Sequence, residues 1–186
     1  MTENTVLFVG VGGKGVLTIG ELLAQAGISQ YACASWTPTY GVQMRGGEAA
    51  CIVILSDDKI ASPILNKVET MVAMAPGSYE NYEDRLNPGG ILIYESTGQV
   101  GRPKREDITS IAAPATEMAI KMGDARLSNM ILLGAFIAST KMVPPHYVEE
   151  EIDGRFMDKK EKREEGAVSP SVRAFREGIK LAAEYK

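Results

Sequence analysis

The chain has 186 residues, of which 45% are hydrophobic, and its formal net charge at pH 7 is −4. This length suits one domain with a substantial core, and without an extended basic run there is no electrostatic basis for binding nucleic acid or an anionic membrane. The N-terminal residues lack the basic region of a signal peptide, and the apolar runs are too short to span a bilayer. We therefore expect a single cytoplasmic domain over residues 1–186.

The first thirty residues predict a strand, a glycine turn and a helix. The apolar run 6–9 leads into Gly10-Val11-Gly12-Gly13-Lys14-Gly15, and apolar residues then recur at helical spacing over 16–26. Gly10, Gly12 and Gly15 fit the G-x-G-x-x-G pattern, in which missing side chains permit a tight turn and let backbone N–H groups approach an anion. Two interpretations stay open: an anion or phosphate site that includes Gly13 and Lys14, or glycines needed only for packing.

A second strand is predicted over 31–36, followed by an irregular segment over 37–47. Pro38 and three glycines, Gly41, Gly46 and Gly47, argue against regular structure there. Arg45 lies beside two of these glycines, and its planar guanidinium can grip a carboxylate or phosphate, although an internal salt bridge is the alternative. Because this segment and the glycine turn both leave the carboxyl ends of strands, we expect them to form one site.

The remaining pattern alternates strands with helices. Strands are predicted over 49–55, 71–75, 91–94 and, more weakly, 108–113; helices over 78–86, 116–122, 129–140, from Pro144 through Glu151 or beyond, and 171–185. Residues 87–90 predict a turn, and the charged run 159–165 a solvated helix or a mobile loop. Apolar runs without period-two alternation favour buried parallel strands. We predict a Rossmann-like three-layer α/β sandwich with a mainly parallel sheet and helices on both faces.

The predicted second strand argues against a conventional dinucleotide site. Such a site needs an acidic residue about 20 positions after the glycines, whereas here the strand ends in Ser35-Trp36-Thr37. The glycine turn is no Walker A loop either, since Lys14 is followed by Gly15 and Val16 and no hydroxyl residue is in place for magnesium. Trp36 and Tyr40 could stack on a planar group, but core packing is the commoner role of such aromatics.

Few residues are suited to catalysis or metal binding. Cys33 and Cys51 are predicted to be buried free thiols, and without a C-x-x-C pair this chain alone cannot hold an iron–sulfur cluster or a cysteine-rich zinc site. His146, the only histidine, is assigned to a helix start. Glu48 and Glu95 are isolated carboxylates near strand ends, which is weak evidence for acid–base chemistry. The chain thus predicts a binding architecture without catalytic or metal-ligating residues.

Several motifs, in order and spacing, match one known family. They are Gly10 to Gly15, Thr39 to Gly47, Ile54 to Asp57, Ile60 to Pro63, Asn87 to Gly90, Ala113 to Thr116 and Asn129 to Ala135. With them the chain resembles, over nearly its whole length, the gamma subunit of 2-oxoacid:ferredoxin (2-oxoacid:acceptor) oxidoreductases. Lys14 departs from the glutamine usual in that family. The form Tyr-Gly-x-x-Met-Arg-Gly-Gly is closest to the 2-oxoglutarate members, while branched-chain and indolepyruvate enzymes stay open.

The resemblance implies a non-catalytic subunit of an oxygen-sensitive complex of anaerobic metabolism. That complex decarboxylates a 2-oxo acid, passes the acyl group to coenzyme A and reduces ferredoxin. Thiamine diphosphate and the iron–sulfur clusters are expected in the alpha, beta and delta partners, and none in this chain. We expect Gly10, Gly12, Gly13, Lys14, Gly15, Tyr40, Gly41, Arg45, Gly46 and Gly47 to meet coenzyme A or a partner subunit. The alternatives are a stand-alone NAD(P)-binding oxidoreductase and a purely structural assembly subunit.

Overall fold

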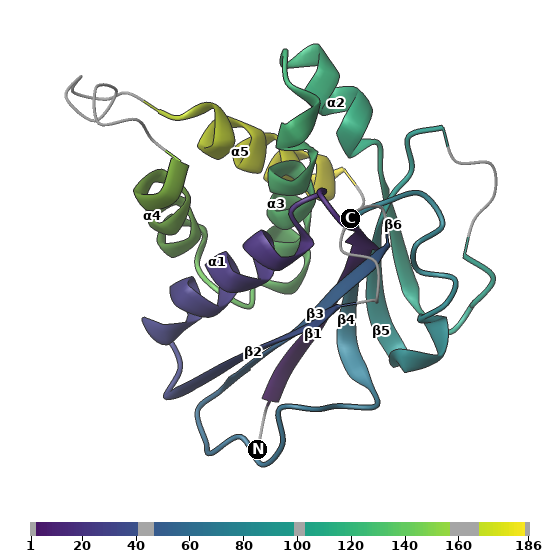
Figure 1. Ribbon diagram of the computed structural model, residues 1–186, viewed down its shortest axis with the longest axis vertical. Helices are drawn as coiled ribbons and strands as arrows, with labels where there is room; N and C mark the ends of the chain where they lie inside the picture. Colours follow the sequence, from purple (N-terminus) through teal and green to yellow (C-terminus); the bar gives the residue numbers. More distant parts are fainter. Residues whose placement is uncertain (1–2, 41–46, 99–102, 157–167, 185–186) are drawn as a thin grey trace.

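A six-stranded sheet organises the protein, seen here in a computed structural model that describes residues 3–40, 47–98, 103–156 and 168–184 (Figure 1). The strands are β1 Glu3–Val11, β2 Cys33–Tyr40, β3 Glu48–Ser56, β4 Val68–Ala73, β5 Leu86–Glu95 and β6 Thr109–Ala113. Their spatial order is β2-β3-β1-β4-β5-β6. The pairs β1–β4, β4–β5 and β5–β6 are parallel, whereas β3 is antiparallel to both β1 and β2. The fold is α/β with a mixed, mostly parallel sheet, and the predicted fold class is confirmed.

The helices are close to the predicted positions. They are α1 Val16–Ile28, α2 Ala115–Lys121, α3 Ser128–Thr140, α4 Pro145–Phe156 and α5 Pro170–Ala183. Gly123, with φ +96°, follows the end of α2, and the Ser169 hydroxyl accepts from the Val172 N–H at 3.2 Å to cap α5. The charged run 159–165 lies outside the described residues. Within the described chain, no helix is long and apolar enough to cross a membrane.

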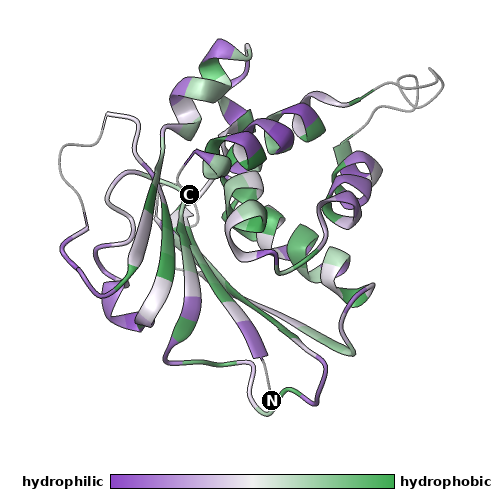
Figure 2. Ribbon diagram, turned by 180° about the vertical axis from the view of Figure 1, so that it is seen from behind, coloured by the Kyte–Doolittle hydropathy of each residue, from purple (hydrophilic) through white to green (hydrophobic). Residues whose placement is uncertain are grey.

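The α-helices of the described residues lie on one face of the sheet, so the prediction of helices on both faces is wrong (Figure 1). Along β1, Val6 and Phe8 belong to the core beneath the helices, while Leu7 and Val9 belong to a second core. Loop residues such as Tyr79, together with β5, complete that second core. The strands are apolar on both faces, and in Figure 2 the middle of the sheet is largely green. The sequence pattern was thus interpreted correctly for burial but not for what covers the second face.

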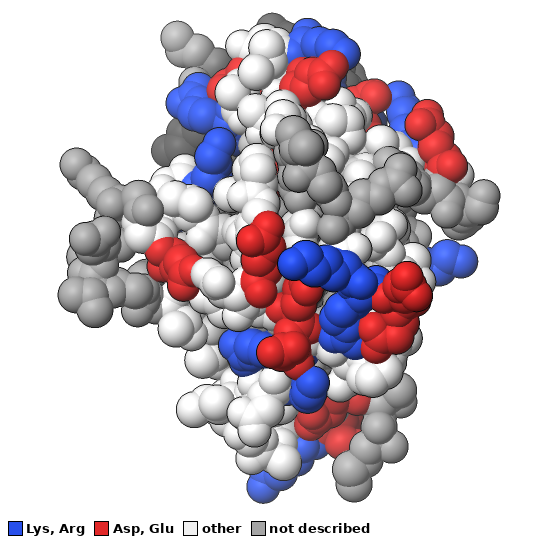
Figure 3. Space-filling model, turned by 90° about the vertical axis from the view of Figure 1, so that its right-hand side faces the viewer, with Lys and Arg blue, Asp and Glu red and all other residues white. Residues whose placement is uncertain are grey.

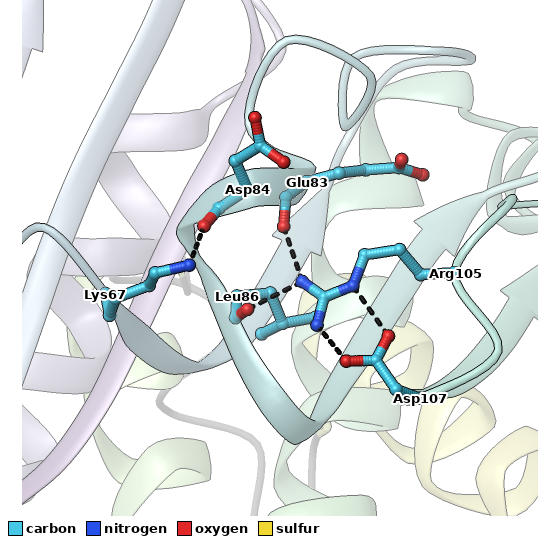
Figure 4. Close-up of polar contacts among 6 residues, drawn as sticks. All are labelled: Lys67, Glu83, Asp84, Leu86, Arg105 and Asp107. Carbon is cyan, nitrogen blue, oxygen red and sulfur yellow. Dashed lines mark hydrogen bonds and ion pairs between the residues drawn. The ribbon is translucent and has the colours of Figure 1, made fainter.

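Cationic side chains fasten the loops of this second face to one another (Figure 4). Arg105 donates to the carbonyl oxygens of Glu83 at 2.8 Å and Leu86 at 2.6 Å, and it pairs with Asp107. Lys67 donates to a carbonyl oxygen of the 3-10 turn η1 (Glu83–Arg85). Figure 3 shows basic and acidic side chains intermingled on this side of the molecule. Hydrogen bonds from side chains to loop carbonyls therefore stabilise an irregular layer in place of helices.

Three local predictions are corrected. No helix forms over 78–86, where the Ser78 hydroxyl bonds back to the Ala75 carbonyl oxygen at 2.8 Å and only turns and η1 follow. Residues 87–90 lie inside β5, although Gly89 keeps φ +77° and the β4–β5 register shifts between Val68 and Thr70. The second strand does not end at residue 36 but continues through Pro38 to Tyr40. It can, because β2 is an edge strand, where a missing N–H leaves no neighbour unpaired.

Two helical glycines bring α3 and α5 into backbone contact. A Cβ at Gly134 would lie 2.0 Å from the Phe175 carbonyl oxygen, and one at Gly178 would lie 1.9 Å from that of Ile131. The helices can approach this closely only because neither position carries a side chain. The contact fixes α3, whose first ten residues are all buried except Asn129, and thereby fixes the position of its N-terminus.

Candidate functional site

The glycine turn connects β1 to α1 in backbone conformations that favour glycine. Gly13 has φ +93°, and Gly15, at the N-cap of α1, has φ +78°. A side chain at Gly10 would crowd Val16 and Met74, whose atoms would lie 3.0 and 3.2 Å from its Cβ. A Cβ at Gly15 would lie 2.4 Å from Asn129 Nδ2. Gly10, Gly13 and Gly15 thus each have a local structural reason to be glycine.

The two predicted halves of the site meet. The Gly12 N–H donates to the Gly47 carbonyl oxygen at 2.9 Å, and Tyr40, at the end of β2, pairs in register with Ala49. The two ends of the 41–46 segment therefore lie at the same edge of the sheet as the glycine turn. Gly41, Arg45 and Gly46 lie outside the described residues, so their part in the site stays a prediction.

A cavity of about 420 Å³ opens over the glycine turn. Its lining comes from the turn and from the chain entering α3: Val11, Gly12, Gly13, Lys14, Gly15, Ala125, Arg126, Ser128 and Asn129. The starts of α1 and α3 thus face one space. Free N–H groups and the positive end of the dipole at a helix N-terminus both favour an anion.

The α3 side of this cavity was missing from the predicted site. Leu127 occupies the N-cap position of α3, and Ser128 begins the helix. Ser128 is only 6% exposed, and no described residue hydrogen-bonds to its hydroxyl. Since Trp36 Nε1 is the one buried side-chain polar atom of the described residues without a partner, the Ser128 hydroxyl is open to the cavity that it lines. The available signal was the Ser-Asn pair at the start of the most apolar helix, but more than 110 residues of sequence separate it from the glycines.

Two cations border the cavity. Lys14 is exposed and makes no ion pair within the described chain. Arg126, also exposed, is paired with Asp124 at 2.7 Å, and the hydrogen bonds between them raise the pKa of Arg126 and lower that of the Asp124 carboxyl. The Asp124 carboxylate also accepts from the Arg126 backbone N–H at 2.9 Å. Of these two charges, Lys14 is the one free to meet an anion without breaking an existing pair.

The other residues singled out from the sequence have structural roles in the described chain. Glu95 is 1% exposed and accepts from the Thr97 N–H at 2.7 Å and from the Thr116 N–H and hydroxyl at 2.8 and 2.7 Å, so it holds the start of α2. The Glu48 carboxylate accepts from Asn81 Nδ2 at 2.7 Å. His146 stacks on Tyr147 near the start of α4, as its helix-start assignment implied.

The two free thiols differ in burial, and the indole nitrogen next to Cys51 is buried as well. Cys51 is buried as predicted, and burial raises its pKa to about 12, whereas Cys33 is only partly buried. The Trp36 indole nitrogen is buried and has no hydrogen-bond partner among the described residues. Within the same residues, no group of three or more His, Cys, Asp or Glu side chains could hold a metal ion.

The sheet order also differs from that of a dinucleotide fold. Because β3 is antiparallel to both neighbours, β1 and β2 run parallel, but β3 lies between them. Two strand spacings, about 9–10 Å, therefore separate the end of β2 from that of β1. In the dinucleotide fold the two strands are neighbours, which brings the acidic residue to the ribose. Here both the acidic residue and the adjacency are lacking.

Comparison with known proteins gives the family. The family model described as pyruvate ferredoxin/flavodoxin oxidoreductase matches residues 5–181. The chain belongs to this family. The 2-oxoglutarate synthase subunit KorC of Methanothermobacter marburgensis is 29% identical over 189 residues, which cover 98% of each chain. The resemblance to the gamma component of this family, expected from the motifs, is confirmed.

Other matches cover part of longer proteins. The ketoisovalerate oxidoreductase subunit VorA of Methanothermobacter thermautotrophicus is 36% identical over 136 residues, which make up 73% of this chain and 28% of VorA. The fold matches a 2-oxoglutarate:ferredoxin oxidoreductase from Magnetococcus marinus, solved with 2-oxoglutarate, coenzyme A and succinyl-CoA bound. The TM-score is 0.86 at 22% identity, over 99% of this chain and 32% of that one. The chain thus spans less than a third of some of its relatives.

Proposed function

We propose that this chain is the gamma-type subunit of a complex that oxidatively decarboxylates a 2-oxo acid to an acyl-CoA and reduces ferredoxin. In this proposal the chain lacks catalytic residues of its own. Alpha, beta and delta partners supply thiamine diphosphate and the iron–sulfur clusters, and the chain contributes a binding surface for coenzyme A. The observation that carries the proposal is the cavity where the starts of α1 and α3 meet beside Lys14.

The cavity suits a phosphate group of coenzyme A. Its backbone is held close to the ligand space by positive-φ glycines, its rim carries Lys14 and Arg126, and Ser128 offers an unused hydroxyl. Backbone N–H groups, hydroxyls and cations at a helix start are the usual ligands of phosphates in proteins. The Magnetococcus complex, similar in fold, was solved with coenzyme A bound. Arg45 would add a second guanidinium from the segment that ends at Gly47.

The proposed substrate is 2-oxoglutarate. KorC relatives match along nearly the whole of both chains, whereas the more identical VorA matches cover 28% of the longer protein. The form of the Tyr40 to Gly47 motif favours the same assignment. The 2-oxo acid itself would be selected in the partner subunits. This part of the proposal is therefore tested by supplying the assembled complex with different 2-oxo acids and measuring which of them supports the reduction of ferredoxin.

The coenzyme A contact can be tested in the reconstituted complex. Lys14→Ala, Ser128→Ala and Arg45→Ala are compared with Lys180→Ala, which removes an equal charge from the exposed face of α5. We expect each of the first three to raise KM for coenzyme A by about two- to tenfold at unchanged assembly, and the control to leave it unchanged. Desphospho-coenzyme A, which lacks one phosphate, shows whether that group is the one bound.

Two results would decide against this site. Unchanged KM and unchanged assembly in all three variants would exclude these residues from coenzyme A binding. A lower yield of complex with unchanged kinetics for each assembled complex would assign them to a partner interface, as the assembly-subunit alternative predicts. Calorimetric binding of NAD or NADP by the isolated chain would instead support a stand-alone oxidoreductase.

A further inference from the structure

A second cavity of about 420 Å³ lies at the end of the sheet opposite the glycine turn. It is formed where β1, β4 and β5 begin and α3 ends, and it is lined by Asn4, Glu69, Thr70, Asn87, Pro88, Gly89, Gly90, Ile91, Ser139, Thr140 and Met142. Nothing in the proposed coenzyme A contact uses these residues. The volume falls in the range of small-molecule sites.

Thr70, on the cavity wall, has a hydroxyl that makes no hydrogen bond within the described chain. Along β4 it alternates with Met71 of the loop-side core and shares its side with Val72 of the helix-side core. By the same alternation Asn4 and Ile91 belong to the helix side of their strands, beneath α3. Thr70 is only 3% exposed, yet no described residue hydrogen-bonds to its hydroxyl. Since Trp36 Nε1 is the one buried side-chain polar atom without a partner in the part of the chain that the structure describes, the Thr70 hydroxyl is open to the cavity and available to a ligand.

Apart from the Asn87 amide, which carries both donors and an acceptor, the other polar side chains of the wall mainly offer acceptors. Asn4 donates through Nδ2 to the Tyr31 hydroxyl at 3.2 Å, which leaves its Oδ1 unused within the described chain. The hydroxyls of Ser139 and Thr140 donate to carbonyl oxygens one turn earlier in α3, at 2.7 and 2.9 Å. Their protons are therefore committed, while their lone pairs can accept. A ligand that complements this wall must donate several hydrogen bonds.

The charge of the cavity has one sign. Glu69 is the only charged residue of the lining, and no ion pair to its carboxylate occurs among the described residues. The C-terminal end of α3 adds the negative end of its dipole. From the acceptor-rich wall, the free Thr70 hydroxyl and this charge, we propose that the cavity binds a small organic cation through an ammonium or guanidinium group. Such groups carry several donors and no acceptor.

The proposal is tested on the full chain by two-dimensional NMR titration with matched cationic and neutral molecules. Methylguanidinium is compared with methylurea, and propylammonium with propanol. We expect saturable shifts around Thr70 and Ser139 with the cations only, with a Kd of about 0.1–10 mM for ligands of so few atoms. Thr70→Val should weaken binding about fivefold or more, and Thr109→Val, a control at an exposed threonine of β6, should not.

Glu69→Gln gives a second variant that does not depend on core packing, because Glu69 is exposed. It should weaken cation binding and reduce its dependence on salt. Equal shifts with methylurea and methylguanidinium, no saturable shift with either cation, or unchanged binding in both Thr70→Val and Glu69→Gln would each overturn the proposal. None of these results bears on coenzyme A, whose contact lies at the opposite end of the sheet.

Discussion

Adding one methyl group to α3 tests the close contact between α3 and α5. In Gly134→Ala the new Cβ would lie 2.0 Å from the Phe175 carbonyl oxygen and 3.0 Å from the Ile179 nitrogen. Both neighbours are backbone atoms of α5, so no side chain can turn away to make room. The two helices must therefore move apart, or the substituted chain must lose part of the helix-side core.

The size of the effect follows from the geometry. An ordinary Cβ contact begins near 3.4 Å, so the contact at 2.0 Å is 1.4 Å too short. Moving α3 and α5 apart by a distance of this order opens gaps along their interface. Even small gaps between packed atoms remove much of their dispersion energy. Overpacking of this kind costs about 1–3 kcal/mol or more, and the better helix propensity of alanine returns about 1 kcal/mol. We expect a net loss of about 1–2 kcal/mol in the free energy of unfolding.

The assay is urea unfolding followed by circular dichroism, with Gly154→Ala as the matched control. Gly154 is exposed in the last turn of α4, and its Cβ would meet no atom within 4 Å. The same substitution should stabilise the chain there by about 0.5–1 kcal/mol, because only the propensity changes. Opposite signs at the two sites support the backbone contact. Equal effects, or a stabilised Gly134→Ala, would refute the packing of α3 against α5 described above.

Three further changes have defined outcomes. Arg105→Lys should lower the free energy of unfolding almost as much as Arg105→Ala, by about 1–2 kcal/mol, because one ammonium cannot reach both carbonyl oxygens and Asp107. Ser169→Ala should cost about 1 kcal/mol through loss of the α5 cap, measured in the same way. Burial raises the pKa of Cys51 to about 12, so its contribution to stability is complete below about pH 8.5 and is lost as the pH rises toward 12. Unfolding midpoints should fall over that window in the wild type and less in Cys51→Ala, and iodoacetamide should label Cys33 before Cys51; equal labelling would contradict the burial.

Local patterns predicted the helices and most strands because each element's own residues determine them. The signals for these elements repeat or act within three or four residues. Examples are the apolar face of α1, the apolar residues all round α3 and the Ser169 cap. Strand pairing has no such local signal. Nothing within 48–56 says that β3 enters the sheet antiparallel between β1 and β2, and that insertion makes β2 an edge strand that tolerates Pro38.

The second face of the sheet could not be predicted for a related reason. The strand residues facing it, such as Leu7 and Val9, are as apolar as those beneath helices, so burial alone suggested a helical layer. What covers them is a set of loops whose order depends on Arg105 and Lys67 reaching carbonyl groups 17 to 22 positions away. Such contacts leave no periodicity in the sequence.

The candidate site divides along the same line. Its first half, Gly10 to Gly15, was predictable because positive φ or close approach restricts Gly10, Gly13 and Gly15 to glycine. Its second half is set by tertiary packing: Gly134 and Gly178 let α5 hold α3, and α3 in turn places Asn129 against Gly15. A substitution that separates the two helices should therefore disturb the cavity at the start of α3 as well as the core. If Gly134→Ala folds, an altered KM for coenzyme A in its reconstituted complex, beside an unaltered value for Gly154→Ala, would link this packing to the site.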